Sequence, residues 1–98
     1  MGSNLHKSTI PKIVAILNLL KVNGEMHIRG LAKKIGAKSP FTVTHILENY
    51  LDFFVDIKEV EVYGFKAKLV RLKPGKENTT IEDVLRYYWT KKRIKGNV

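Results

Sequence analysis

A helix stop followed at once by a helix start constrains the fold of this chain more than any other feature. Gly36 ends a segment, residues 28–35, in which apolar side chains recur at spacings of three and four. Ser39 and Pro40 then form the N-cap and first-turn pair of a new helix, predicted to run to about residue 51. The spacing centred on Gly36-Ala37-Lys38 is typical of two helices packed across a tight turn.

A longer helix is predicted ahead of this pair. It begins near Pro11, with Ser8 or Thr9 as its cap, and ends at Gly24, which supplies a left-handed residue. Residues 25–27 are long enough only for a strand stub. The N-terminal half is therefore expected to form a three-helix core with one very short strand.

From residue 55 onward β-branched residues become frequent, and their pattern predicts a two-stranded hairpin. A two-residue turn at Tyr63-Gly64 aligns four apolar pairs and three opposite-charge pairs across the strands. The charge pairs are Glu61 with Lys66, Glu59 with Lys68, and Asp56 with Arg71. A turn at Gly64-Phe65 would oppose Lys58 to Arg71 and is disfavoured. Tyrosine is a poor residue for positive φ, which leaves the turn type open.

A last helix is predicted to run to about Arg93. Thr79 and Thr80 precede Glu82 and Asp83, which gives the capping-box pattern in two frames. An apolar stripe follows at helical spacing, made of Ile81, Val84, Leu85, Tyr88 and Trp89. The stripe is assigned to homodimerisation, because with Tyr87 it exceeds what one small core needs. Closure of the monomer core against the first helix is the alternative.

The charge of the chain favours a polyanionic partner. Its 98 residues carry 18 basic and 9 acidic side chains, a net charge of +9. Nucleic acid is the first candidate and an anionic membrane surface the second, while a merely solubilising surface stays open. Residues 29–45 and 63–76 are strongly basic, whereas residues 48–62 hold five acids against one lysine. The polyanion surface is expected on the two basic segments, with the acidic one turned away or neutralised internally.

Several function classes lose support from what the sequence lacks. There is no cysteine, and His6, His27 and His45 have no metal-ligand spacing, so no metal or other cofactor is expected. No nucleophile–base pair, phosphate loop or paired carboxylate site is visible, so an enzyme is not expected. No apolar run approaches the ~20 residues of a membrane span, and residues 1–7 lack a signal core. A cytoplasmic protein without membrane association is predicted.

The order of helix, strand stub, helix, tight turn, helix, hairpin and helix resembles the winged helix-turn-helix family, nearest to MarR-like and PadR-like regulators. Residues 28–36 resemble the second helix of that family. Residues 41–47 resemble its recognition helix, with His45 where arginine is common, and residues 69–75 resemble the end of its wing. The resemblance covers residues 10–76 and implies an α+β fold with a three-helix core, a two-stranded wing and a C-terminal helix.

The chain departs from the family pattern in two places. His27 stands where Ser or Thr usually caps the second helix, and the tip of the wing lacks the usual Asp-Arg pair. The chain is predicted to comprise a DNA-binding domain over residues 1–76 and, over residues 77–98, a C-terminal helix with a basic tail that is the expected dimerisation element. The lysine- and isoleucine-rich composition suggests an archaeon or one of its viruses.

The resemblance and the charge pattern together predict a homodimeric transcriptional regulator that reads duplex DNA in the major groove. The residues expected to reach the bases lie early in the third helix: Lys38, Ser39, Phe41, Thr42, Thr44 and His45. The residues expected to hold phosphates are Arg29, Lys33 and Lys34, with Lys66 and Lys68 from the wing. Glu48 and Asp52 lie further along the same exposed side and would repel phosphates. The helix should therefore enter by its N-terminal end.

Two other functions remain open at this level. Charge spread over several segments also suits a low-specificity DNA-organising protein of chromosomes or plasmids. A protein-interaction module is the third possibility, because Val60, Val62, Phe65 and Ala67 share one side of the hairpin. Phe41 could equally staple onto the second helix, and the basic run of residues 91–95 could be a solvated helix end.

Overall fold

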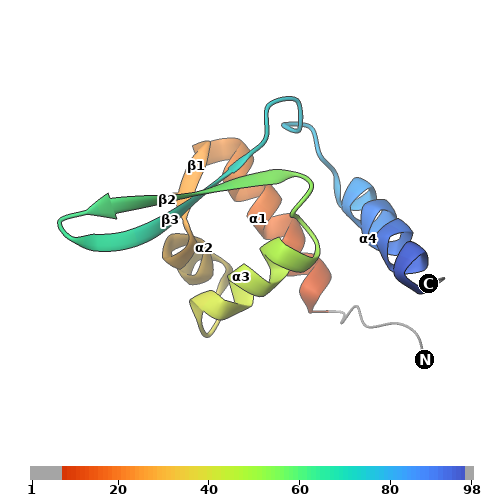
Figure 1. Cartoon of the computed structure of the whole chain (residues 1–98), viewed down its shortest axis with the longest axis horizontal. Helices are drawn as coiled ribbons and strands as arrows, with labels where there is room; N and C mark the ends of the chain where they lie inside the picture. Colours follow the sequence, from red (N-terminus) through yellow and green to blue (C-terminus); the bar gives the residue numbers. More distant parts are fainter. Residues whose placement is uncertain (1–7, 97–98) are drawn as a thin grey trace.

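A computed structural model describes residues 8–96 of the chain, with side chains as far as residue 93. This part is an α+β fold with four helices and one three-stranded antiparallel sheet (Figure 1), an arrangement compatible with a winged helix. The elements in chain order are α1 (Thr9–Asn23), β1 (Glu25–His27), α2 (Ile28–Ile35), α3 (Pro40–Asn49), β2 (Val55–Val62), β3 (Phe65–Leu72) and α4 (Ile81–Gly96). The expectations for residues 1–7 lie outside the described residues.

The junction between α2 and α3 forms as predicted. Gly36 is left-handed, with φ of 75°, and the N–H of Ala37 donates to the Ala32 carbonyl at 2.9 Å. Ser39 then caps α3, because its hydroxyl oxygen accepts from the Phe41 N–H at 3.0 Å, with Pro40 in the first turn. The bend fixes how α3 is presented beside α2.

The start of α1 differs from the prediction. The helix begins at Thr9, two residues ahead of Pro11, and its N-cap Ser8 makes no side-chain capping hydrogen bond. Ser8 has helical backbone angles (φ −73°, ψ −17°), whereas a capping side chain acts from an extended residue. The expected Ser8 or Thr9 cap is therefore wrong, and packing of the apolar face of α1 holds this helix.

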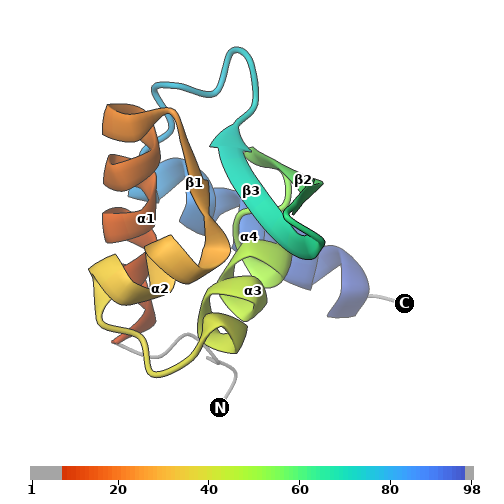
Figure 2. The same ribbon diagram turned by 90° about the vertical axis from the view of Figure 1, so that its left-hand side faces the viewer.

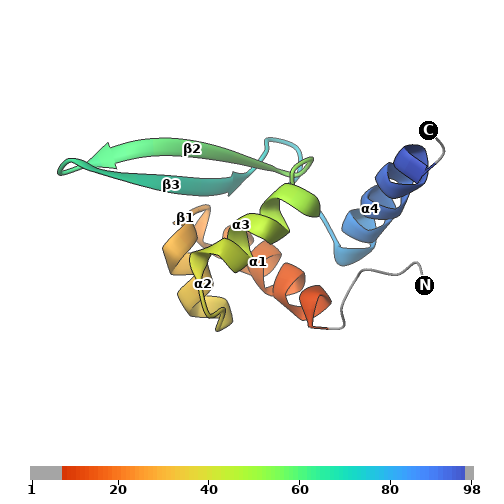
Figure 3. The same ribbon diagram turned by 60° about the horizontal axis from the view of Figure 1, so that its bottom comes forward.

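The hairpin has the predicted register throughout, from Val55 opposite Leu72 to Val62 opposite Phe65. Its turn has positive φ at both central residues, 51° at Tyr63 and 82° at Gly64, which is the signature of a type I′ turn. The strand stub β1 pairs with β3 and gives the sheet order β1-β3-β2. Because β1 pairs with β3 only as far as Leu69, the outer part of the hairpin extends beyond β1, as Figure 3 shows.

Figure 2 shows α1, α2 and α3 gathered beside the sheet, and one hydrophobic core joins these helices and α4 to the base of the sheet. Its fully buried side chains come from five elements and the α3–β2 loop: Ile13, Ile16, Leu20, Leu31, Val43, Leu47, Leu51, Val70 and Val84. Burial at this density supplies most of the stability of a domain this small. The core therefore holds α2, α3 and the hairpin in fixed relative positions.

The capping box of α4 uses the second of the two predicted frames. The Thr80 N–H donates to Asp83 Oδ2 at 3.0 Å, and the Asp83 N–H donates to Thr80 Oγ1 at 3.2 Å. The hydrogen bond from the Thr80 backbone lowers the pKa of the Asp83 carboxyl below its ordinary value. Lys21 Nζ also donates to the Thr79 carbonyl at 2.7 Å and ties this loop to α1.

The assignment of the α4 stripe to a dimer interface is wrong for two of its residues. Val84 is fully buried and Tyr88 is 9% exposed within this single chain. The Tyr88 ring lies 4.8 Å from that of Tyr50, and burial of Tyr50, with Tyr88 beside it, raises the pKa of the Tyr50 phenol. Ile81 and Leu85 are half-buried, and Trp89 is 41% exposed. The alternative, closure of the monomer core, holds for Val84 and Tyr88.

Within residues 8–96, no helix combines the length and the apolar character needed to cross a membrane.

Candidate nucleic-acid interface

A basic groove lies between the outer part of β3 and the starts of α2 and α3. Its volume is about 490 Å³. The residues that line it are His27, Ile28, Arg29, Pro40, Thr44, Phe65, Lys66, Ala67 and Lys68. Four of the predicted contact residues, far apart in sequence, thus meet around one hollow: Arg29, Thr44, Lys66 and Lys68.

The electrostatics of the basic groove suit an anion. The first turn of α2 carries no acidic side chain, and its N-cap His27 makes no side-chain capping bond. Backbone N–H groups at a helix start carry partial positive charge, which here adds to the Arg29 guanidinium. In the described part of the chain, the charged atoms of Lys66 and Lys68 form no ion pair within 4 Å, although Glu61 and Glu59 stand opposite them. Their charges remain available to a phosphate.

The exposed side of α3 runs alongside this groove and begins with an aromatic ring. Phe41 is 82% exposed and His45 is exposed one turn later, whereas Thr42 and Thr44 are half-buried beside them. The alternative in which Phe41 staples onto α2 is therefore not realised. Ser39 uses one lone pair of its hydroxyl oxygen in the helix cap, and its O–H remains available to donate to a ligand.

The ring of His45 is oriented by a residue that the sequence did not single out. The Asn49 amide nitrogen donates to the His45 carbonyl at 2.8 Å, which fixes the orientation of the amide. The same nitrogen lies 3.1 Å from His45 Nδ1, so a neutral ring accepts there and holds its proton on Nε2. The spacing of four residues within a helix was the only signal for this contact. His45 thus has an N–H donor on its outer edge.

Two of the five acids in the acidic segment, Asp52 and Asp56, are paired within the described chain. Asp52 accepts from Lys91 Nζ at 3.3 Å and from the Tyr87 hydroxyl at 3.2 Å, so α4 covers its charge. Asp56 lies 3.9 Å from Arg71 across the hairpin. Glu48 remains exposed towards the C-terminal end of α3. The N-terminal half of α3 is therefore the less acidic end of the helix.

The other predicted phosphate contacts lie outside the basic groove. Lys33 and Lys34 are exposed in the last turn of α2, and Lys38 is exposed in the turn before α3. They flank the start of α3 in sequence and do not line the hollow. Of the basic tail, Lys91 is engaged with Asp52, and the side chains beyond residue 93 lie outside those described.

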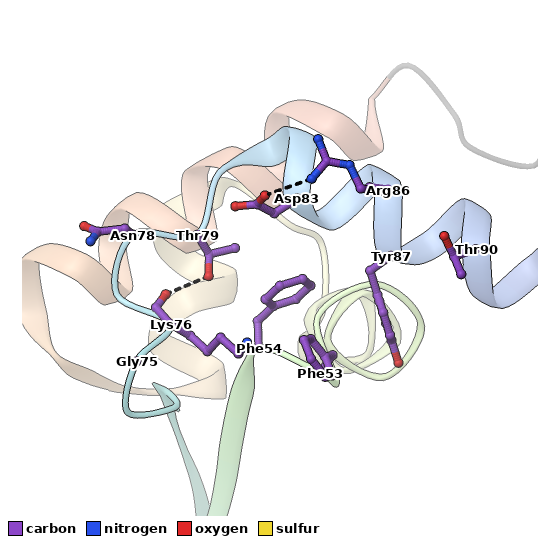
Figure 4. Close-up of a pocket in the computed structure, with 10 residues that line it drawn as sticks. All are labelled: Phe53, Phe54, Gly75, Lys76, Asn78, Thr79, Asp83, Arg86, Tyr87 and Thr90. Carbon is purple, nitrogen blue, oxygen red and sulfur yellow. Dashed lines mark hydrogen bonds and ion pairs between the residues drawn. The ribbon is translucent and has the colours of Figure 1, made fainter.

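A second hollow of about 490 Å³ lies between α4 and the corner that precedes β2 (Figure 4). It is lined by Phe53, Phe54, Gly75, Lys76, Asn78, Thr79, Asp83, Arg86, Tyr87 and Thr90. The rings of Phe53 and Tyr87 stack at 5.1 Å, Lys76 Nζ stands 4.4 Å from the Phe53 ring, and Asp83 lies 3.7 Å from Arg86. The charged groups that line this hollow already contact other residues of the chain. The hollow is therefore best explained as part of the packing contact between α4 and the corner that precedes β2.

Among residues 8–96, no three histidine, aspartate or glutamate side chains gather as a metal site requires. No protein-family model matches this chain, and a search of curated proteins finds no relative.

Proposed function

We propose that this chain is a winged helix-turn-helix protein that binds duplex DNA and regulates transcription. The observation that carries the proposal is the basic groove, in which Arg29, Lys66 and Lys68 flank the exposed N-terminal half of α3. In such a complex α3 is the recognition helix, the β2–β3 hairpin is the wing, and the groove holds the phosphate backbone between them.

The outer edge of α3 would supply base recognition. The Nε2–H of His45 can donate to the O6 or N7 acceptor of guanine, and the Phe41 ring can contact a thymine methyl. Thr42 and Thr44 offer hydroxyls to base edges or phosphates. Neutralisation of Asp52 by Lys91 removes a repulsive charge from the C-terminal end of the helix.

We propose further that the protein acts as a homodimer on a two-fold site. One domain of this size touches too few base pairs for high specificity, and two copies double the sequence that is read. With Val84 and Tyr88 used in the monomer core, the surface of α4 left for a partner is the exposed Trp89 with the half-buried Ile81 and Leu85.

The test is selection of a preferred sequence from a random duplex pool, followed by affinity measurements on variants. His45→Ala is expected to weaken binding to the selected duplex by about 10- to 100-fold, the equivalent of ~1–3 kcal/mol for one base contact, and to leave binding to a scrambled duplex nearly unchanged. Glu48→Ala, on the same exposed side of α3, is the matched control and should not weaken binding. Equal losses on both duplexes would indicate a low-specificity DNA-organising protein instead.

A further inference from the structure

The tip of the hairpin carries a strained residue that no contact within the chain explains. Tyr63 has φ of 51°, in the left-handed region where glycine, asparagine and aspartate are the usual residues. Its side chain is 96% exposed, so packing against the described chain does not offset the strain. A strained residue retained without internal contacts points to a role outside the chain.

Two more apolar side chains flank this tyrosine. Val62 and Phe65 are the last cross-strand pair before the turn, and they are 46% and 77% exposed. Hairpin turns ordinarily carry small polar residues. Val62, Tyr63 and Phe65 together form what we call the aromatic tip.

The aromatic tip is continuous with the basic groove. Phe65 lines that groove together with Arg29, Lys66 and Lys68. The four residues of β3 between the turn and Leu69 extend roughly 13 Å at ~3.3 Å per residue. Figure 1 shows the hairpin projecting past the helices. A polyanion held in the groove would therefore lie against the tip, and the cations at its base are complementary to phosphates.

We propose that the aromatic tip enters the minor groove of bound duplex DNA, wedges against a base step and bends the duplex. This inference rests on the proposed function and adds a mode of contact to it. Apolar side chains that enter the minor groove unstack base steps in this way, and the bent duplex then meets more of the protein surface. Contact of this kind depends on the deformability of the base step more than on its hydrogen-bond pattern.

Tyr63→Asn separates this role from a structural one, because Asn-Gly is the preferred sequence of a type I′ turn. The experiment uses the full chain and the duplex selected by the wild type, with fluorophores on both DNA ends to report bending. The variant is expected to melt at the same or a higher temperature, to bind that duplex about 10-fold more weakly, and to bend it less. Val22→Ala, which shortens an apolar side chain 82% exposed at the end of α1, is the control and should change neither binding nor bending.

Any other result would contradict the proposal that the aromatic tip wedges against a base step. Wild-type affinity and bending in Tyr63→Asn would overturn it and leave the proposed DNA-binding function intact. Weaker binding with unchanged bending would reduce the tip to a surface contact, and a lower melting temperature would mean that Tyr63 serves the fold. If the wild type binds no duplex at low salt, the proposed function itself fails.

Discussion

Replacing Arg29, Lys66 and Lys68 together by glutamine is expected to weaken binding to the selected duplex on the order of 100-fold near 0.1 M salt. The three cations line the basic groove, and each should neutralise one phosphate and release the counterions condensed on it. Loss of three such contacts should also lower the slope of log K against log salt by about 3, since each contributes ~0.9. Filter binding or fluorescence anisotropy over a salt series measures both quantities.

A variant of equal charge controls for the general loss of cations. Lys12→Gln, Lys58→Gln and Arg86→Gln together remove two lysines and one arginine that do not line the groove. Long-range attraction between exposed charges is screened beyond ~10 Å at this salt concentration, so this control should lose only a few-fold in affinity. Equal losses in the two triple variants would mean that the groove has no special part in binding.

Val84→Asp is expected to unfold the protein, whereas Trp89→Asp should leave it folded. Val84 is fully buried in the core of the single chain, and an unpaired carboxylate there would cost more than ~4 kcal/mol out of a typical total of 5–15 kcal/mol. Trp89 is 41% exposed on the same helix, and its substitution should instead shift the proposed dimer towards monomer. Circular dichroism and sedimentation velocity measure the two effects.

This pair of variants distinguishes the two uses of α4. If α4 served only to join two copies, Val84→Asp would give a folded monomer, and its melting curve would remain cooperative. That result would contradict the packing of Tyr88 on Tyr50 at 4.8 Å as a determinant of the fold. A folded Trp89→Asp variant that remains dimeric would remove α4 from the proposed interface.

Most elements were predictable from signals that are local in the sequence, although the local cap signal at Ser8 or Thr9 failed. The Gly36 stop, the Ser39-Pro40 start and the capping box at Thr80 each depend on residues within four positions of one another. The hairpin register was predictable because one choice of turn satisfied charge and apolar pairing along the whole length of both strands. The segments that form the basic groove could be named from charge alone.

Tertiary contacts were the part that the sequence left open. An apolar stripe on α4 has the same spacing whether it packs on its own chain or on a second copy. Only the burial of Val84 and Tyr88 within the single chain distinguishes the two. Nothing in the sequence around Phe41 indicates whether its ring is exposed or buried. The ion pair between Lys91 and Asp52 joins residues 39 positions apart in the chain, and no periodic sequence pattern predicts a contact at that separation.

Amide chemical-shift mapping of the labelled chain during titration with the selected duplex tests most directly which face meets DNA. The largest changes are expected in the first turn of α2, in residues 41–45 of α3, and in residues 65–68 of β3, because these segments surround the basic groove. Changes centred on Glu48, Asp52 and α4, with residues 41–45 unaffected, would contradict entry by the N-terminal end of α3.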